Sequence, residues 1–399
     1  MDSATLDAST LEACISAAVA APSIYNTQPW RYRLDPDTVT FQVRAAPERG
    51  LRQADPTGRA LHLSVGASVF NLRVAVAHFG WSPVTRLLPS PGDSGLLATV
   101  RLTGAASRRP TGHRADLYAA IWRRHSSRFP VSGKPLPSHV HIELAEAARM
   151  EGGLLSFPSP DETARVLGLA QEAEHRNRND PDRGAESRRW VQRDGHEPAD
   201  LGIPQTGLGP QDAHERLAMR DFTAQRHPER LLAQPFEPDP VIAVLTTEHD
   251  RRSDWLRAGQ ALEHVLLVAT AQGLRASPLH QPMEWPDLRR SLSPMPGHNG
   301  HAQMLVRLGY GPAGPATPRR AVDRVLDTGL PDRQGAEWRP TALGAPAVTG
   351  AERPYANGPD GARTGSRRPC PVPCVGGHHR EWSGLRDVRG QRRKTMRRQ

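Results

Sequence analysis

APSIYNTQPW, residues 21–30, joins the first predicted helix of the chain to its first predicted strands. Upstream of it, Ser9 and Glu12 fit a capping box, in which each side chain satisfies a backbone amide at the start of a helix. Apolar residues then recur at helical spacing, and Pro22 is expected to stop the helix because proline lacks the amide hydrogen that a helix interior requires. The stretch is therefore predicted to leave the helix as an irregular loop.

The residues after this loop predict a strand hairpin. Two short runs, 31–34 and 39–43, flank the turn sequence Asp35-Pro36-Asp37. Ser23 and Asn26 thus lie between a helix and a strand, where their side chains can either satisfy the turn itself or bind a ligand. The residues alone leave both alternatives open.

An internal repeat is the second informative feature. The pattern from Arg59 to Phe79 is apolar on most sides, which predicts a central, buried helix. A similar pattern recurs later, and glycines are 14 residues apart in both, at Gly66 and Gly80 and at Gly259 and Gly273. A strand containing Val-Arg-Leu follows each helix. The repeat favours a duplicated helix and strand unit, although coincidence is an alternative because buried helices often end in glycine.

The net charge of +10 in 399 residues raises the question of a nucleic-acid partner. From Asp327 to the end the chain has 14 basic and 7 acidic residues, so most of the excess lies there and the body is nearly neutral. This end of the chain is rich in Gly, Pro and Arg and has no hydrophobic periodicity, which predicts a disordered basic tail over residues 327–399. We therefore expect no specific nucleic-acid partner.

The cysteines and the apolar segments suggest a cytoplasmic protein. Cys14, Cys370 and Cys374 are too few for a disulfide framework. Cys370, Cys374 and the pair His378-His379 do not have the spacing of two zinc knuckles, so no metal is expected. The first residues resemble no signal peptide, and no run of 18 apolar residues predicts a membrane span.

Two motifs give the chain a family resemblance. Residues 21–30 resemble the A-P-S-x-x-N-x-Q-P-W motif of FMN-dependent nitroreductases, and Arg124-His125-Ser126 resembles their R-H-S motif. Ordinary members are obligate dimers in which R-H-S comes first in the chain, and each flavin takes one motif from each subunit. Here the order is inverted, and each half carries only one motif. The chain is similar to the Acg-like branch of the family, in which one chain imitates a dimer.

The resemblance, which spans residues 8–325, implies an α+β, nitroreductase-like fold of two tandem halves that form an intramolecular pseudo-dimer. The first half is expected at residues 1–116 and the second at 117–326. Residues 176–236 match the ordinary family least, and we expect them to form an insertion that covers the flavin as a lid. A loose surface excursion is the alternative. As a pseudo-dimer, the protein is expected to be a monomer.

The resemblance also implies which residues hold FMN. The phosphate is expected to meet Arg124, His125 and Ser126 and one of two further arginines, Arg319 or Arg320, between which the sequence does not decide. The ribityl chain or the ring is expected beside Ser23, Tyr25 and Asn26. Backbone amides near ring atom N5 are expected from Leu279, His280 and Gln281. No side chain is expected to act as an acid or base.

Two functions remain open at this point. The first is an oxidoreductase that moves hydride from NAD(P)H to FMN and then to a small aromatic, nitro or quinone acceptor. The second is a protein that sequesters FMN under a lid and has little turnover. A rapid reduction of bound flavin by NADPH would distinguish the first from the second.

Overall fold

The structure of the chain is a computed structural model that describes residues 6–105, 113–192, 200–222, 232–292, 294–295 and 298–327. Residues 328–399, which hold the expected tail and the Cys370 and His378 motif, lie outside the described residues, as do two pieces of the expected lid. The described chain is a mixed helix and sheet structure with two four-stranded antiparallel sheets.

The first half contains α1 (Ala8–Val19) and a sheet in the order β1-β2-β4-β3. Its strands are β1 (Trp30–Asp35), β2 (Thr40–Ala45), β3 (Trp81–Leu87) and β4 (Leu96–Ala105). The expected hairpin is present, with Asp35 paired to Thr40 in register. The expected capping box at Ser9 is wrong, because the N-cap of α1 is two residues earlier, at Asp7, whose side chain accepts the Thr10 amide hydrogen.

The second half repeats this topology in the order β5-β8-β12-β9. Its strands are β5 (Leu154–Ser156), β8 (Val241–Thr247), β9 (Arg275–Leu279) and β12 (His301–Gly309). Helix α4 (Ser138–Met150) precedes its first strand, as α1 precedes β1. In each sheet the strand that directly follows the long helix lies at the edge. The duplicated unit expected from the glycine spacing is therefore seen as two sheets of matching strand order.

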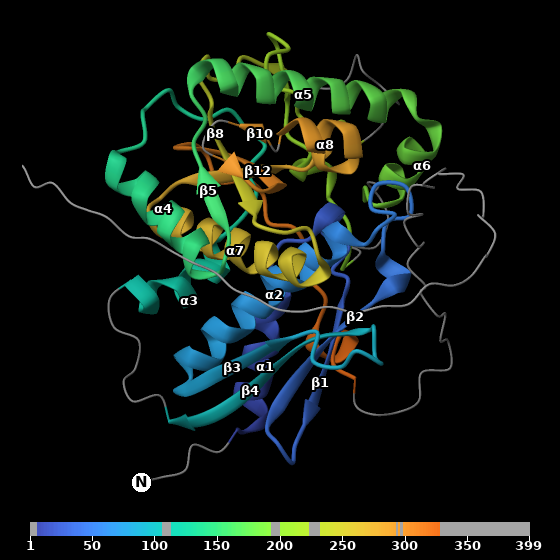
Figure 1. Ribbon diagram of the computed structural model, residues 1–399, viewed down its shortest axis with the longest axis vertical. Helices are drawn as coiled ribbons and strands as arrows, with labels where there is room; N and C mark the ends of the chain where they lie inside the picture. Colours follow the sequence, from blue (N-terminus) through green and yellow to red (C-terminus); the bar gives the residue numbers. More distant parts are fainter. Residues whose placement is uncertain are drawn as a thin grey trace, which may run out of the picture. The chain divides into compact units, whose positions relative to one another are not determined.

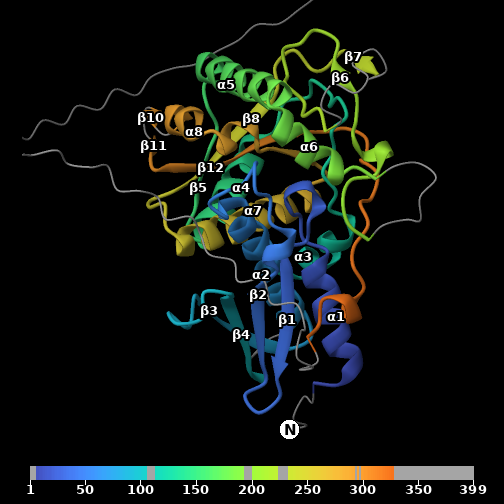
Figure 2. The same ribbon diagram turned by 90° about the vertical axis from the view of Figure 1, so that its right-hand side faces the viewer.

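The two long helices α2 (Arg59–His78) and α7 (Arg252–Ala271) cross at the centre, between the two sheets (Figures 1 and 2). They touch at the first glycine of each repeat. A Cβ atom on Gly66 would lie 2.2 Å from the Leu256 carbonyl oxygen, and one on Gly259 would lie 2.0 Å from the Leu63 carbonyl oxygen. Only glycine permits this approach of the two backbones. The second glycines, Gly80 and Gly273, follow the helices with positive φ, as expected for C-terminal caps.

Two further segments, α3 with the residues after it and the chain after β12, connect the two halves. Helix α3 (His113–Arg123) packs against both central helices, and the Ser127 amide then donates to the Ala276 carbonyl oxygen of β9 at 3.0 Å. After β12 the chain returns to the first half, where Val325 is buried in its core and the Asp327 amide donates to the Tyr32 carbonyl oxygen. The division of the chain at residues 116 and 117 stays a prediction.

Helices α5 (Pro160–Asn179) and α6 (Pro181–Arg189) lie at the end of the molecule that belongs to the second half (Figures 1 and 2). The remaining short elements are η1 (Ile24–Asn26), η2 (Pro47–Arg49), η3 (Gln205–Gly207), β6 (Gln211–Asp212), β7 (Ala233–Gln234), η5 (Gln281–Glu284), α8 (Pro286–Leu292), β10 (Pro294–Met295), β11 (His298–Asn299) and η6 (Val322–Arg324). The expected lid is thus continuous with α5, which begins at Pro160.

Among the described residues, α2 is the one helix whose length and composition would allow it to cross a membrane. However, 83% of its most apolar window is buried inside the protein. Its apolar character is therefore explained by its central place between the two sheets.

Candidate functional site

The loop that carries the first motif has an unusual backbone. Tyr25, Asn26 and Gln28 have φ values of 52°, 54° and 48°, in the left-handed region. Such a conformation costs a non-glycine residue on the order of 1–3 kcal/mol, and it persists only where surrounding contacts hold it. Strained backbone of this kind is concentrated at functional sites.

Asn26 supplies the contacts that hold this loop. Its side-chain amide donates both hydrogens, to the Gly202 and Pro318 carbonyl oxygens, each at 2.9 Å. Its carbonyl oxygen Oδ1 accepts a hydrogen bond from Arg319 Nη1 at 3.0 Å. Asn26 therefore joins three segments that are far apart in the sequence: its own loop, the expected lid and the chain after β12.

Two arginines lie side by side behind the loop. Arg124, directly after α3, and Arg319, after β12, both donate to the Ala20 carbonyl oxygen, at 3.1 and 3.3 Å. Burial, and then the charge of Arg124, lower the pKa of Arg319 to about 9. Within the described part of the chain, the Nε atoms of both arginines are buried without a hydrogen-bond partner. Arg124 Nε lies 3.4 Å from Glu263 Oε1, whereas Arg319 has no ion pair among the described residues. A buried arginine without its own counter-ion fits an anionic ligand.

The neighbouring motif residues differ in what they contact. Arg320 does not line the space beside Arg124 and Arg319. Its backbone amide donates to Gln28 Oε1, and its Nε lies 3.3 Å from Asp200 Oδ2. His125 is half-buried, and burial together with Arg124 lowers its pKa, so the ring is neutral near pH 7. Of the two arginines between which the sequence did not decide, Arg319 is the one beside Arg124.

Two adjoining spaces form one cavity in front of these arginines. The smaller, with about 410 Å³ of empty volume, is cationic and is lined by Asn26, Arg124, Thr317 and Arg319 among others. The larger, with about 840 Å³ including some open solvent, is mostly apolar and reaches Leu63, Leu262 and Leu279. Five residues line both spaces: Pro22, Ser23, Tyr25, Ser126 and Arg128. Both motifs of the sequence therefore border the junction between a cationic end and an apolar end.

Arg128 lines the cavity. The sequence alone did not show whether Arg123 or Arg128 would be exposed to solvent. Arg123 is exposed, whereas Arg128 donates from Nη1 to the Gly207 carbonyl oxygen at 2.7 Å and lies 4.8 Å from the Phe222 ring centre. Burial, and then Arg220, lower the pKa of Arg128 to about 10. No acidic side chain in the described ranges forms an ion pair with it, so it adds to the positive charge of the cavity.

The segment Leu279–Gln281 lines the far wall of the larger space. Arg59 Nη2 lies 2.7 Å from His280 Nε2, and His280 Nδ1 lies 3.0 Å from Glu284 Oε1. Because a guanidinium can only donate, Nε2 accepts and Nδ1 carries the hydrogen that Glu284 accepts. Burial lowers the pKa of His280 to about 4, which keeps the ring in this neutral form. Its side chain is fully engaged, so only its backbone faces remain for a ligand.

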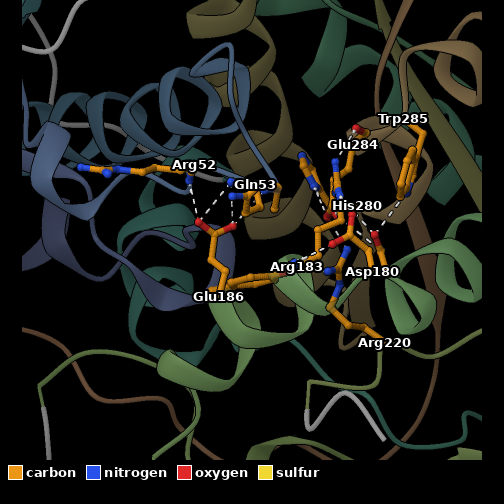
Figure 3. Close-up of polar contacts among 12 residues, drawn as sticks. Arg52, Gln53, Asp180, Arg183, Glu186, Arg220, His280, Glu284 and Trp285 are labelled. Atoms are coloured by element: carbon orange, nitrogen blue, oxygen red, sulfur yellow. Dashed lines mark hydrogen bonds and ion pairs between the residues drawn. The ribbon is translucent and has the colours of Figure 1, made fainter.

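Three residues of the expected lid also line the larger space: Met219, Arg220 and Phe222. The Arg220 guanidinium donates to Glu284 Oε1 of η5 in the second half (Figure 3). It also donates to the Tyr25 hydroxyl oxygen and thereby connects the loop of the first half to η5. The Phe222 ring meets Tyr25 edge-on, 5.5 Å between ring centres. The sequence contained no signal for these contacts because Arg220 and Glu284 belong to no motif.

Other contacts join α6 to the first half, to Phe222 of the expected lid and to the second half. The Glu186 carboxylate accepts the backbone amide hydrogens of Arg52, Gln53 and Ala54 at 2.6–3.2 Å (Figure 3). Ser187 Oγ donates to the Phe222 carbonyl oxygen at 3.1 Å. Arg183 reaches Glu284 Oε2 at 3.2 Å and lies 4.2 Å from the Trp285 ring centre. The described part of the segment is therefore fixed over the cavity by both halves.

Several known proteins are similar to this chain in sequence. No family model matches the chain. Rv3131 of Mycobacterium tuberculosis H37Rv, named as a candidate NAD(P)H nitroreductase, is 33% identical over 327 residues, 80% of this chain and 92% of that protein. Acg of the same organism, which carries the same kind of name, is 28% identical over 81% of this chain and 97% of its own length.

Solved structures with partial similarity are also nitroreductases. One from Anabaena variabilis covers 73% of this chain and 82% of its own, with a TM-score of 0.39 and 12% identity. NfnB from Sphigopyxis sp. strain HMH, described as FMN and NADPH-dependent, covers 53% of this chain and 97% of its own, with a TM-score of 0.32 and 17% identity. The identity of 33% to Rv3131 over four fifths of this chain decides the matter. This chain belongs to the NAD(P)H nitroreductase family, in the branch that includes Acg.

Proposed function

We propose that this chain binds one FMN molecule and is a flavin-dependent oxidoreductase. The observation that carries the proposal is the junction of an apolar space with a cationic one, which Arg124, Arg128 and Arg319 line. A phosphate monoester fits the cationic end, because guanidinium and phosphate form strong charge-assisted hydrogen bonds. A flat aromatic ring fits the apolar end, which Leu63, Leu262 and Met304 line.

The proposed contacts follow from which residues line each space. Arg124, Arg319 and Ser126 would meet the phosphate end, with His125 close by. Ser23 and Arg128, which line both spaces, would meet the ribityl chain or the ring edge. Tyr25, Leu279, His280 and Gln281 would border the ring, the last three by their backbone. Asn26 would hold the loop in place, since both of its amide hydrogens are engaged elsewhere.

The halves differ in a way that supports one flavin rather than two. Ten residues join α1 to β1 in the first half, and they form the loop that borders the cavity. In the second half only Glu151, Gly152 and Gly153 join α4 to β5. A connection this short has no residues to spare for a second such loop, so we expect the pseudo-dimer to keep a single site and to work as a monomer.

Bound FMN supplies the capacity to take up and release a hydride, which the side chains of this site do not have. In the proposed reaction the hydride comes from NAD(P)H, and the electrons pass to a small aromatic, nitro or quinone acceptor. The protein would bind and orient the ring, and Arg128 would provide positive charge at its edge.

The lid gives a second candidate function its own support. Because Met219, Arg220 and Phe222 line the apolar space from the lid side, they occupy a place where a nicotinamide would have to stack. Hydride transfer needs reacting atoms about 3–3.5 Å apart. A protein whose lid stays closed would therefore store FMN and turn over slowly.

One experiment tests both candidates. Purified protein should have the visible absorbance of a bound flavin. If the protein is an oxidoreductase, anaerobic addition of NADPH should rapidly reduce the flavin and bleach this absorbance. Protein that remains colourless after incubation with added FMN would refute the binding proposal. Slow bleaching by NADPH with fast bleaching by dithionite would favour the storage function over the oxidoreductase.

A further inference from the structure

Glu263 is a buried acid that the proposed function leaves unexplained. It lies in the middle of α7 with an exposed fraction of 0%, among apolar residues of the central helix pair. Neither carboxyl oxygen has a hydrogen-bond partner within the described residues. A buried carboxylate without donors is costly, so its presence requires a compensating charge nearby.

That charge is Arg124. Glu263 Oε1 lies 3.4 Å from Arg124 Nε, and Arg319 adds a second, weaker attraction. Across the helix crossing, Asn71 of α2 faces the same carboxyl group. Within the described residues, Glu263 is the only acid that pairs with Arg124, and Arg319 pairs with none. The carboxylate thus serves two arginines that have no other counter-ion.

We infer that Glu263 is the internal counter-ion of the anion site, a positioning residue that holds Arg124 and takes up a proton when a phosphate binds. The inference rests on the proposed binding of FMN and adds a proton to that event. Three guanidiniums, those of Arg124, Arg128 and Arg319, and the one carboxylate of Glu263 leave a net charge of about +2 in the site. A phosphate monoester brings a charge of about −1.5 to −2 at pH 7, so an ionised Glu263 would then oppose it.

The direction of the proton movement follows from this balance. Burial raises the pKa of Glu263 to about 7, while Arg124 opposes that rise. The bound phosphate would compete for Arg124 and add a negative charge, and both effects raise the pKa of Glu263 further. At pH 7.5 the acid is largely ionised before binding and would be protonated after it. With a pKa of about 7, Glu263 is about one-quarter protonated at pH 7.5 before binding, so binding should take up at most about three-quarters of a proton and should weaken as pH rises above 7.

Other titrating groups must be separated from Glu263. The phosphate itself has a pKa near 6, so it is already a dianion at pH 7.5. Arg319, with a pKa of about 9, is already protonated at that pH. His125 faces Arg124, Arg319 and Arg275, which hold its pKa low, and a bound phosphate could also raise it. His125 is therefore the group that needs its own variant.

The test measures proton uptake upon FMN binding to the full chain, freed of flavin, by titration calorimetry at pH 7.5 in two buffers of different ionisation enthalpy. We expect uptake of up to about three-quarters of a proton in the wild type and close to none in Glu263→Gln, with His125→Gln retaining it. The Kd of the wild type should weaken by about fivefold from pH 7 to 8, while that of Glu263→Gln stays level.

The outcomes separate this inference from the proposed function. FMN that binds without proton uptake at pH 7.5, or uptake that disappears in His125→Gln instead, overturns the role of Glu263 and leaves the flavin site intact. Absence of FMN binding at any pH refutes the proposed function itself. If Glu263→Gln does not fold, the wild-type pH dependence of Kd and the Glu263→Asp variant, which should retain uptake, decide the question.

Discussion

Two guanidiniums that share the carbonyl oxygen of Ala20 impose a cost on the fold, because like charges repel strongly where water is excluded. Burial, and then this repulsion from Arg124, lower the pKa of Arg319. An anion that enters the cationic space relieves it, so part of the binding free energy would come from removing repulsion already present. Arg319 should therefore affect ligand affinity more than it affects stability.

Replacing Arg319 with glutamine should weaken FMN binding by about ten- to a hundredfold, because a hydrogen bond to a charged group contributes about 1.5–3 kcal/mol. The midpoint of urea unfolding should change little or rise, since the repulsion with Arg124 is lost. Fluorescence titration of FMN measures the affinity. Arg149→Gln is the matched control, because that side chain is 71% exposed and pairs only with Glu146. Equal affinities in the two variants would contradict the phosphate assignment.

Sequence motifs identified some residues of the site and could not identify others. The loop residues and Arg124 belong to motifs, whereas Arg128 lies two residues after the second motif and the sequence did not distinguish it from Arg123. Glu263 interrupts an otherwise apolar helix pattern, and that interruption was a signal that could have been used. Arg220 and Glu284 had no such signal, because their roles arise from contacts between segments that only the fold brings together.

At the scale of elements, the crossing of α2 and α7 decides how the halves fit. Periodicity predicted both helices, and the hairpin turn predicted the first two strands, because these patterns depend on local spacing. The equal glycine intervals predicted duplication but not that Gly66 and Gly259 would meet. The N-cap of α1 was predicted wrongly because Asp7 and Ser9 are both residue types that cap helices. The sequence does not show which of the two precedes the first helical residue, and in the structure it is Asp7.

Gly259→Ala should lower the free energy of unfolding by about 1–3 kcal/mol or more, the usual cost of overpacking a core. Its Cβ would lie 2.0 Å from the Leu63 carbonyl oxygen, a backbone atom that cannot move alone. Gly168→Ala is the matched control, since a Cβ there meets nothing within 4 Å in the exposed face of α5. That control should gain up to about 1 kcal/mol from helix propensity. Urea unfolding of both variants measures the difference, and equal midpoints would contradict the close crossing.

Arg220 should act as the latch of the lid, since it contacts Glu284 of one half (Figure 3) and Tyr25 of the other. Arg220→Met should speed anaerobic reduction of bound flavin by NADPH severalfold, while reduction by dithionite stays the same. Arg189→Met, an exposed substitution on α6, is the control. Stopped-flow absorbance follows both reactions. A variant that retains flavin but shows an unchanged NADPH rate would mean that Arg220 does not limit access.

At the scale of the whole molecule, the chain is a pair of related halves that have diverged in their connections. Matching strand orders preserve the symmetry, whereas the three-residue link between α4 and β5 breaks it. The pseudo-dimer was predictable because each half carries one of two motifs that act together in the family. The anchoring of the lid was not predictable, because Glu186 caps three amides 132 to 134 residues away in the sequence.

The chain after β12 is the last part of the molecule that the site requires. It supplies Thr317 and Arg319 to the cationic space, Pro318 to Asn26, and Val325 to the core of the first half. The sequence beyond Asp327 has no hydrophobic periodicity and is rich in Gly, Pro and Arg, so it offers little apolar surface for a core to bury. A chain that ends at Asp327 should therefore fold and bind one FMN, with the thermal midpoint and the Kd of the full chain.

A shorter chain that ends at Gly311 provides the contrast. It loses Arg319 and the carbonyl oxygen that Asn26 contacts, and it exposes the apolar surface that Val325 covers. We expect it to bind FMN at least a hundredfold more weakly, because at least one charge-assisted contact of about 1.5–3 kcal/mol is lost together with the loop anchor. Flavin absorbance per chain after gel filtration measures both truncations. Two flavins per chain in the longer form would reject the single-site pseudo-dimer, and flavin loss in that form would show that residues 328–399 take part in binding.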